Sequence, residues 1–178
     1  MGRGADRGET RAGKPQGRAP IPKEIAQPLR DLLRHRKALR LILQQVSKED
    51  YLGAMRNGSA EDVLRLVYPL ERAVEVASNY TIALATRGLR LLGVESSSGS
   101  DALRQLHEQG AISQGMRKRL TAVNRVRNEA QHEYELVRGS ALYEVALEQD
   151  TLLEPFLQSY VRWLDKLGLG GAARQDGE

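Results

Sequence analysis

The chain has 178 residues, the size of one ordinary domain and too short for two independent cores. Apolar residues make up 40% and charged residues 28%, and the absence of cysteine excludes disulfide scaffolds, cysteine-ligated metal sites and thiol catalysis. The net charge is +4, but the first twenty residues alone hold five basic and two acidic residues, so basicity is weak evidence for a nucleic-acid partner. We expect a soluble cytoplasmic domain without a membrane span, because no apolar run approaches the roughly 18–20 residues that a span needs.

The two ends of the chain differ in composition from the middle. Residues 1–20 contain five glycines and five basic residues but no Leu, Ile, Val or aromatic residue. Such a segment cannot bury enough apolar surface to offset its ordering entropy, so we expect a disordered basic tail. The glycine-containing residues 169–178 should form a flexible C-terminus. Residues 21–168 then form the predicted domain.

This domain is predicted to be helical. Pro69 is the one proline between residues 29 and 154, and no strand-length stretch alternates apolar with polar residues. The first helix should run over 29–46 with Pro28 in its first turn, because its apolar residues recur every three or four positions. A short helix over 47–55 should follow it.

The middle of the chain predicts one long and one short helix. Ser59, with an acidic residue three positions later, resembles the N-cap of a long helix over 59–92. Pro69 should kink this helix, because proline cannot donate the usual backbone hydrogen bond. The Ser-rich stretch 93–100 should be a loop, and the short helix after it should end at Gly110.

The last third of the chain predicts helices again. Ser113 is expected to cap a helix with one apolar face, formed by Met116, Leu120, Val123 and Val126. After Gly139 the spacing predicts a helical segment over 142–147, and Thr151-Leu152-Leu153-Glu154 has the spacing of a capping box. A last helix with a Leu-rich apolar stripe should begin there. All these elements together predict an all-α, up-and-down helical bundle.

The residues that carry chemistry lie near the end of the helix that Ser113 begins. They read Arg127-Asn128-Glu129-Ala130-Gln131-His132-Glu133-Tyr134. An imidazole moves protons near neutral pH, and a guanidinium holds phosphate oxygens in a fork while it stays charged. Because the 2′-hydroxyl of RNA is a built-in nucleophile, His132 and Arg127 suit RNA cleavage without a metal ion.

Helix geometry limits how these two side chains act together. Positions five apart diverge by about 140° on a straight helix, so Arg127 and His132 of one such helix do not address one phosphate. Either the helix breaks between them, or a second chain contributes one of the groups. Asn128, four residues before His132, shares its face, and Lys118 and Arg125 share a face with each other.

The order Arg, Asn, three residues, His, one residue, Tyr resembles the HEPN family, and more narrowly the HepT-like toxins of MNT/HEPN toxin–antitoxin modules. The resemblance runs from about Arg56 to Leu167 and includes the segment Tyr68-Pro69-Leu70-Glu71-Arg72-Ala73. It implies a HEPN-type bundle that forms a homodimer. In that family two protomers bring their motifs together at a two-fold axis and form a metal-independent ribonuclease site that needs no cofactor.

The resemblance also implies roles for individual residues. Arg127 and His132 would be catalytic, and Asn128 would support them. Three cations of the same helix would guide the RNA backbone, namely Arg117, Lys118 and Arg125. A minimal nucleotidyltransferase (MNT) antitoxin would silence the toxin by attaching AMP to Tyr134, as in type VII-like systems.

Alternatives to catalysis by this motif stay open. The same residues suit a non-catalytic helical binding module that pairs with a nucleotidyltransferase or with nucleic acid, or a solvated helix end. Glu129 and His132 also have the spacing found in carboxylate-bridged di-iron bundles, where Glu71 or Glu75 of a dimer would have to complete the ligands. We expect no metal.

The other two histidines are expected to be surface residues. His35 has the same spacing from Arg30 as His132 from Arg127, but neither the Asn nor the Tyr of the motif accompanies it. His107 lies beside Glu108 shortly before a glycine.

Overall fold

The computed structural model describes residues 19–132 and 136–169, and of 129–132 and 136–139 it describes the backbone alone. Almost all of the predicted basic tail and flexible C-terminus therefore lies outside the described residues. The described chain is all-α, as predicted. Within it, no helix combines the length and hydropathy that crossing a membrane requires.

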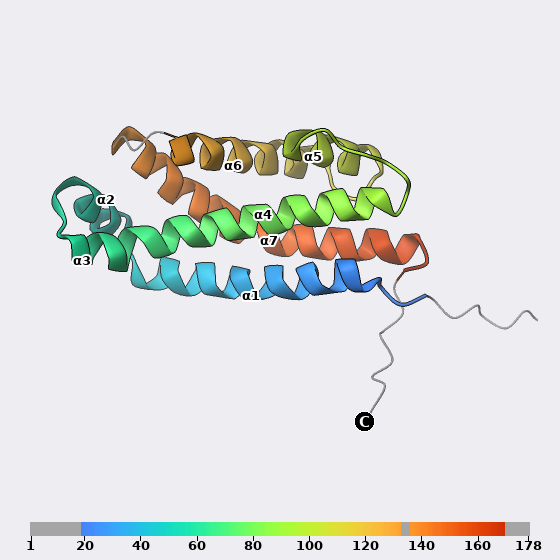
Figure 1. Cartoon of the computed structure of the whole chain (residues 1–178), viewed down its shortest axis with the longest axis horizontal. Helices are drawn as coiled ribbons and strands as arrows, with labels where there is room; N and C mark the ends of the chain where they lie inside the picture. Colours follow the sequence, from blue (N-terminus) through green and yellow to red (C-terminus); the bar gives the residue numbers. More distant parts are fainter. Residues whose placement is uncertain (1–18, 133–135, 170–178) are drawn as a thin grey trace, which may run out of the picture.

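The helices form an up-and-down bundle (Figure 1). In chain order they are α1 (Lys23–Gln45), α2 (Lys48–Asn57), α3 (Ala60–Asp62), the π-helical turn η1 (Val63–Val67), α4 (Tyr68–Arg90), α5 (Gly99–Glu108), α6 (Gln114–His132) and α7 (Leu136–Lys166). The long helices α1, α4 and α7 run along the molecule, while α2 and α3 lie at one end of it. Helices α5 and α6 lie against α4 and α7. The two ends of the domain meet, because the Ala19 amide donates to the Gly168 carbonyl at 3.0 Å.

Helix α1 begins earlier than the sequence predicts, and Pro28 lies inside it rather than in its first turn. Proline lacks the amide hydrogen that would bond the carbonyl four residues earlier, which is that of Glu24. The guanidinium of Arg87 on α4 donates to this carbonyl at 2.7 Å. A tertiary contact thus replaces the helical hydrogen bond that Pro28 removes.

Ser47 and Ser59 begin helices, as predicted. Ser47 accepts from the amide of Asp50, and Ser59 forms a capping box with Asp62. Pro69, where a kink is expected, lies in the first turn of α4 rather than inside an uninterrupted helix. The π turn η1 ends two residues before it, and there the Tyr68 amide donates to the carbonyl of Val63, five residues back. A π turn contains one residue more than an α-helical turn, and this wider turn relieves the clash between a proline ring and the preceding backbone.

The predicted end of the short helix is also confirmed. Gly110 has φ +73° and follows α5. Gly93, with φ +70°, similarly ends the turn after α4, and the next amide, that of Val94, donates to Leu89 at 3.0 Å. A left-handed residue followed by this long-range bond closes a helix end, and glycine adopts it without steric cost. Ser113 caps α6, as predicted, through the amide of Met116.

Helix α7 is continuous, so the predicted separation of its two halves is wrong. Gly139 and the segment Thr151–Glu154 both lie in the helix interior. The Thr151 hydroxyl donates to the carbonyl of Glu148 instead of capping a new helix. The helix changes direction along its length (Figure 1), and Pro155, which leaves the carbonyl four residues earlier without its usual donor, permits such a bend.

Four acidic side chains of α7 pair with basic side chains of other helices. The pairs are Arg36 with Glu154, Arg40 with Asp150, Lys48 with Glu144 and Arg119 with Glu148. Surface ion pairs contribute at most about 1 kcal/mol each, so these orient the neighbours of α7 more than they stabilise the bundle.

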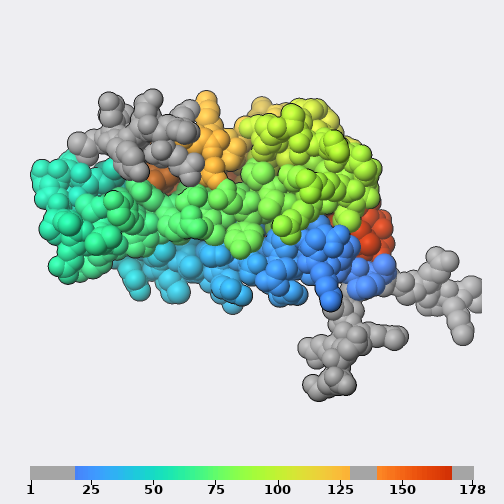
Figure 2. Space-filling view, in the orientation of Figure 1, coloured from blue at the N-terminus to red at the C-terminus, as the bar shows by residue number. Residues whose placement is uncertain are grey.

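The core lies between α1, α4 and α7 and is built mainly from Leu, Ala and Val. The stripe predicted for the last helix is largely buried, including Phe156 and Tyr160, whose hydroxyl donates to the Leu84 carbonyl at 2.7 Å. Val161 and Leu167, which the sequence also places in this stripe, depart from the prediction, because they are 41% and 38% exposed. Figure 2 shows α4 crossing the front face, with α1 on one side of it and α5 and α6 on the other.

Candidate active site

Helix α6 carries the motif and stays helical through His132. It buries Leu120 and Val123 against the rest of the bundle, as the sequence predicts, and leaves Lys118 and Arg125 exposed. The helix does not break between Arg127 and His132, so their directions around its axis differ by about 140°. Of the two possibilities that the sequence leaves open, the broken helix is excluded.

Two amide oxygens hold the guanidinium of Arg127. Its Nη2 donates to Oδ1 of Asn79 on α4, and its Nη1 donates to Oδ1 of the adjacent Asn128 at 2.6 Å. Its Nε is buried and has no hydrogen-bond partner in the described part of the chain. Arg127 is half-buried. Its hydrogen bond to Asn79 connects it to α4 and orients its guanidinium.

The partners of Arg127 leave its charge available. An amide oxygen accepts a hydrogen bond but carries no net charge, whereas a carboxylate would neutralise the guanidinium. Arg119, one of the cations that precede the motif, is held differently. It forms an ion pair with Glu148 on α7, and this contact lowers the pKa of the Glu148 carboxyl. Arg119 therefore joins two helices, while Arg127 keeps a charge that a phosphate can use.

The cations expected to guide RNA lie on the same helix. Lys118 and Arg125 are exposed, and Arg117 is half-buried, with its Nε donating to Gln114 at 2.9 Å. All three precede the motif along α6, which places positive charge between its N-terminus and Arg127.

The remaining motif residues lie at the junction between α6 and α7. His132 is the last residue of α6, and its side chain is outside the described part, as is that of Glu129. Tyr134, the expected AMPylation site, lies outside the described residues altogether. Asn128 is exposed, and the contact described for it is the one with Arg127.

The other histidines have structural contacts. The ring of His35 stacks on that of Tyr80 at a centroid distance of 5.3 Å, and Nδ1 of His107 lies 2.9 Å from the carbonyl oxygen of Ile112. Both side chains are half-buried, so the prediction that they are surface residues is wrong. His35 belongs to the packing between α1 and α4, whereas Arg30 is exposed and donates to Gln27 within α1.

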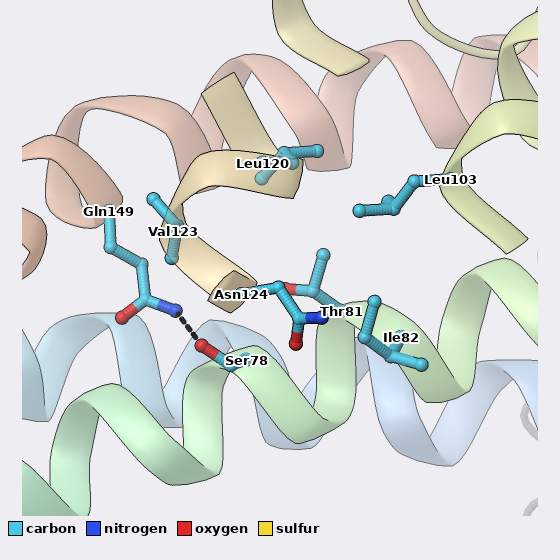
Figure 3. Close-up of a pocket in the computed structure, with 8 residues that line it drawn as sticks. All are labelled: Ser78, Thr81, Ile82, Leu103, Leu120, Val123, Asn124 and Gln149. Atoms are coloured by element: carbon cyan, nitrogen blue, oxygen red, sulfur yellow. Dashed lines mark hydrogen bonds between the residues drawn. The ribbon is translucent and has the colours of Figure 1, made fainter. Parts of the chain in front are cut away.

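A small cavity lies between α4, α5, α6 and α7 (Figure 3). Asn124 of α6 and Ser78 and Thr81 of α4 line it, and Ser78 accepts from Nε2 of the buried Gln149 at 2.9 Å. The cavity measures about 10 Å³, which is room for about one water molecule. A nucleotide therefore cannot enter it.

The di-iron alternative requires Glu71 or Glu75 as additional ligands, and the structure describes both side chains. Glu75 pairs with Arg72 at 2.8 Å. Glu71 is half-buried beside the hydroxyl of Tyr51, and its burial raises the pKa of its carboxyl. Among the described side chains no three His, Asp or Glu residues come together as metal ligands. The two carboxylates that would have had to complete the site face other partners.

Asn79 is the site residue that sequence reasoning missed. It precedes Arg127 by 48 positions and lies in a different helix, and no motif singles it out. An exposed asparagine on a long helix has no distinctive spacing. The packing of α4 against α6 brings it to the motif.

Comparison with known protein families identifies the chain. The HepT-like family, described as ribonuclease HepT-like, matches residues 32–160. This range runs from α1 to α7 and includes the whole motif. Comparisons with curated proteins and with solved structures found no match. The match covers well over half of the chain, and with the all-α bundle it shows that this protein belongs to the HepT-like ribonuclease family.

Proposed function

We propose that this protein is a metal-independent endoribonuclease and the toxin of a type VII-like toxin–antitoxin system. Membership of the HepT-like ribonuclease family supports the reaction class. The observation that carries the proposal is the state of Arg127, which is held at the motif by Asn79 and Asn128 with its charge unpaired by any described carboxylate.

The proposed reaction uses the 2′-hydroxyl of the substrate as nucleophile. His132 accepts the proton of this hydroxyl while the hydroxyl oxygen attacks the adjacent phosphorus. The protonated imidazole then donates this proton to the 5′-oxygen as the bond between that oxygen and phosphorus breaks. The products are a 2′,3′-cyclic phosphate and a 5′-hydroxyl. Arg127 stabilises the negative charge that accumulates on the phosphorane, an interaction that is stronger in the transition state than in the ground state.

The straight α6 favours a site built from two protomers. Because Arg127 and His132 of one helix diverge by about 140°, a homodimer in which His132 of one protomer faces Arg127 of the other would bring both to one phosphate. Asn128 supports Arg127 directly. Arg117, Lys118 and Arg125 would then guide the RNA backbone towards this site.

Regulation of the toxin follows from the family resemblance. A minimal nucleotidyltransferase would be the antitoxin, and it would transfer AMP to the hydroxyl of Tyr134, two residues beyond His132. The bulk and negative charge of an AMP group at this place would exclude an RNA phosphate from Arg127.

The test is cleavage of total RNA by purified protein in the presence of a chelator. We expect fragments with cyclic phosphate ends from the wild type, and a loss of at least about one-hundred-fold in rate for His132→Ala and for Arg127→Ala. Arg162→Ala is the matched control, because this exposed cation lies on α7 beside the N-terminal end of α6.

Other results would contradict the proposal. Cleavage by His132→Ala at the wild-type rate would remove the catalytic assignment. RNA binding without cleavage would favour the non-catalytic binding module, and iron or manganese in the purified protein would favour the di-iron bundle.

A further inference from the structure

The contact between Asn79 and Arg127 joins the outer face of α4 to the catalytic motif. Asn79 is exposed, and its Oδ1 accepts from Nη2 of Arg127. Helix α6 packs against α4. Asn128 supplies the second acceptor from α6 itself. The guanidinium is therefore held from two helices at once.

This contact differs in kind from the basic side chains that tie other helices to α7, and it resembles the tie of Arg87 to the neutral carbonyl of Glu24. The basic side chains that reach α7 from α1, α2 and α6 all end on carboxylates. Arg127 ends on two neutral amides. A carboxylate in place of Asn79 would hold the guanidinium more strongly, since charged hydrogen bonds are stronger than neutral ones. Stability alone would thus favour Asp at this position.

The hydrogen atoms of the guanidinium indicate what the neutral contacts achieve. Asn79 and Asn128 each use one hydrogen, on Nη2 and on Nη1, and Nε is buried without a described partner. One hydrogen on each Nη atom remains for a further acceptor, such as a phosphate oxygen. The amides hold the guanidinium without neutralising it.

We propose that Asn79 is a positioning residue for Arg127 in RNA cleavage, fixing the direction of the guanidinium on α4 while leaving its full charge for the scissile phosphate. This inference rests on the proposed ribonuclease function. It goes beyond it because it places a functional residue on α4, 48 positions before the motif. Without this tie a side chain as long as arginine would lose rotamer entropy upon binding the phosphate.

The decisive variant is Asn79→Asp, which keeps the shape of the side chain and adds one negative charge. We expect kcat for RNA cleavage to fall by about ten- to one-hundred-fold, because a neutralised guanidinium stabilises the phosphorane less. KM should rise by a smaller factor than kcat falls, because the ground state loses one phosphate contact among several, whereas the transition state also loses stabilisation of its additional charge. The melting temperature should stay at or above that of the wild type, because the new ion pair replaces a neutral contact.

Two further variants complete the cleavage experiment. Asn79→Ala removes the acceptor without adding charge, and we expect a smaller loss of kcat, about three- to ten-fold. Gln44→Glu makes the same amide-to-carboxylate change at an exposed position of α1 and should leave cleavage unchanged. Cleavage by Asn79→Asp at the wild-type rate, or an equal loss in Gln44→Glu, would overturn the proposal.

Binding of an RNA with a 2′-deoxy nucleotide at the cleavage point separates this inference from the proposed function. Asn79→Asp should reduce the salt dependence of binding by about 0.7 in the log–log slope, as Arg127→Ala should, because one phosphate contact is lost. This result is expected even if the wild type binds RNA without cutting it, in which case the proposed function fails alone. An unchanged slope in Asn79→Asp, together with a reduced slope in Arg127→Ala, would overturn the role of Asn79 alone.

Discussion

At the scale of single residues, Asp101 organises the start of α5. Its carboxylate accepts hydrogen bonds from the Ser97 amide at 2.9 Å, from Gln105 at 2.8 Å and from Arg104. Its own amide donates to the Ser98 hydroxyl at 3.1 Å. These contacts favour the ionised form and lower the pKa of Asp101 from 3.8 to about 2.

A pH dependence of stability follows from this shift. The pKa of Asp101 is lower in the folded than in the unfolded chain, so its stabilising contribution is present above pH 4 and is lost as the pH falls from about 4 to about 2. We expect Asp101→Asn to lower the melting temperature by about 2–4 °C at pH 6 and to match the wild type near pH 2. Thermal unfolding followed by circular dichroism at both pH values measures this. A difference that stays constant down to pH 2 would contradict it.

At the scale of elements, the packing of α4 against α7 depends on Gly88. A Cβ atom placed there would lie 2.9 Å from Cζ3 of Trp163 and would also meet the hydroxyl of Tyr160. That hydroxyl is already bonded to the carbonyl of Leu84. The glycine therefore gives up helix propensity so that two helices can approach closely.

Two glycine substitutions should change stability in opposite directions. Gly88→Ala should destabilise the protein by about 1–3 kcal/mol, because the clash with Tyr160 and Trp163 outweighs the gain in helix propensity. Gly53→Ala, in the interior of α2 with nothing within 4 Å of the added Cβ, should stabilise it by about 0.5–1 kcal/mol. Urea unfolding measures both. Equal effects of the two substitutions would show that α4 and α7 do not approach as described.

At the scale of the whole molecule, one helix cannot complete the proposed site. Helix α6 runs without a break through Arg127 and His132, and Asn79 of α4 accepts a hydrogen bond from Arg127. The cavity beside Ser78 and Asn124 is too small for a nucleotide. A surface site shared by two protomers is the arrangement that these constraints favour, and its composition can be tested by mixing variants.

We expect two inactive variants to restore activity when their protomers exchange. A heterodimer of Arg127→Ala and His132→Ala would contain one site with both groups intact and one site with neither. Random exchange makes half of the dimers mixed, so cleavage should return to about one quarter of the wild-type rate. The control replaces His132→Ala by the double variant Arg127→Ala/His132→Ala, which should give no recovery. Exchange without recovery in the first mixture would place both groups of a site on one protomer.

Local signals in the sequence determined much of the fold. The serines at 47, 59 and 113 cap helices where expected, because a hydroxyl bonded to an amide two or three residues away needs no distant partner. The apolar periodicity located the buried face of α6, since the helical period by itself sets which residues share a side. The order of Arg127, Asn128, His132 and Tyr134 likewise indicated the family that the comparison confirms.

These local signals could not predict contacts between segments that are far apart in the sequence. Pro28 suggested a helix start, but Arg87 of α4 satisfies the carbonyl that it leaves free, and α1 begins earlier. The capping spacing at Thr151 is real, yet packing against α1, α2 and α6 keeps α7 continuous.

The sequence by itself thus determined that this protein is a helical bundle with a motif of the HepT-like family, because helix period, caps and motif order are properties of neighbouring residues. The tertiary structure alone decided that α6 stays helical from Arg127 through His132 and that Asn79 of α4 holds Arg127 through a neutral amide oxygen. Both depend on how α4 packs against α6, and the free energy of that packing comes from residues that are far apart along the chain.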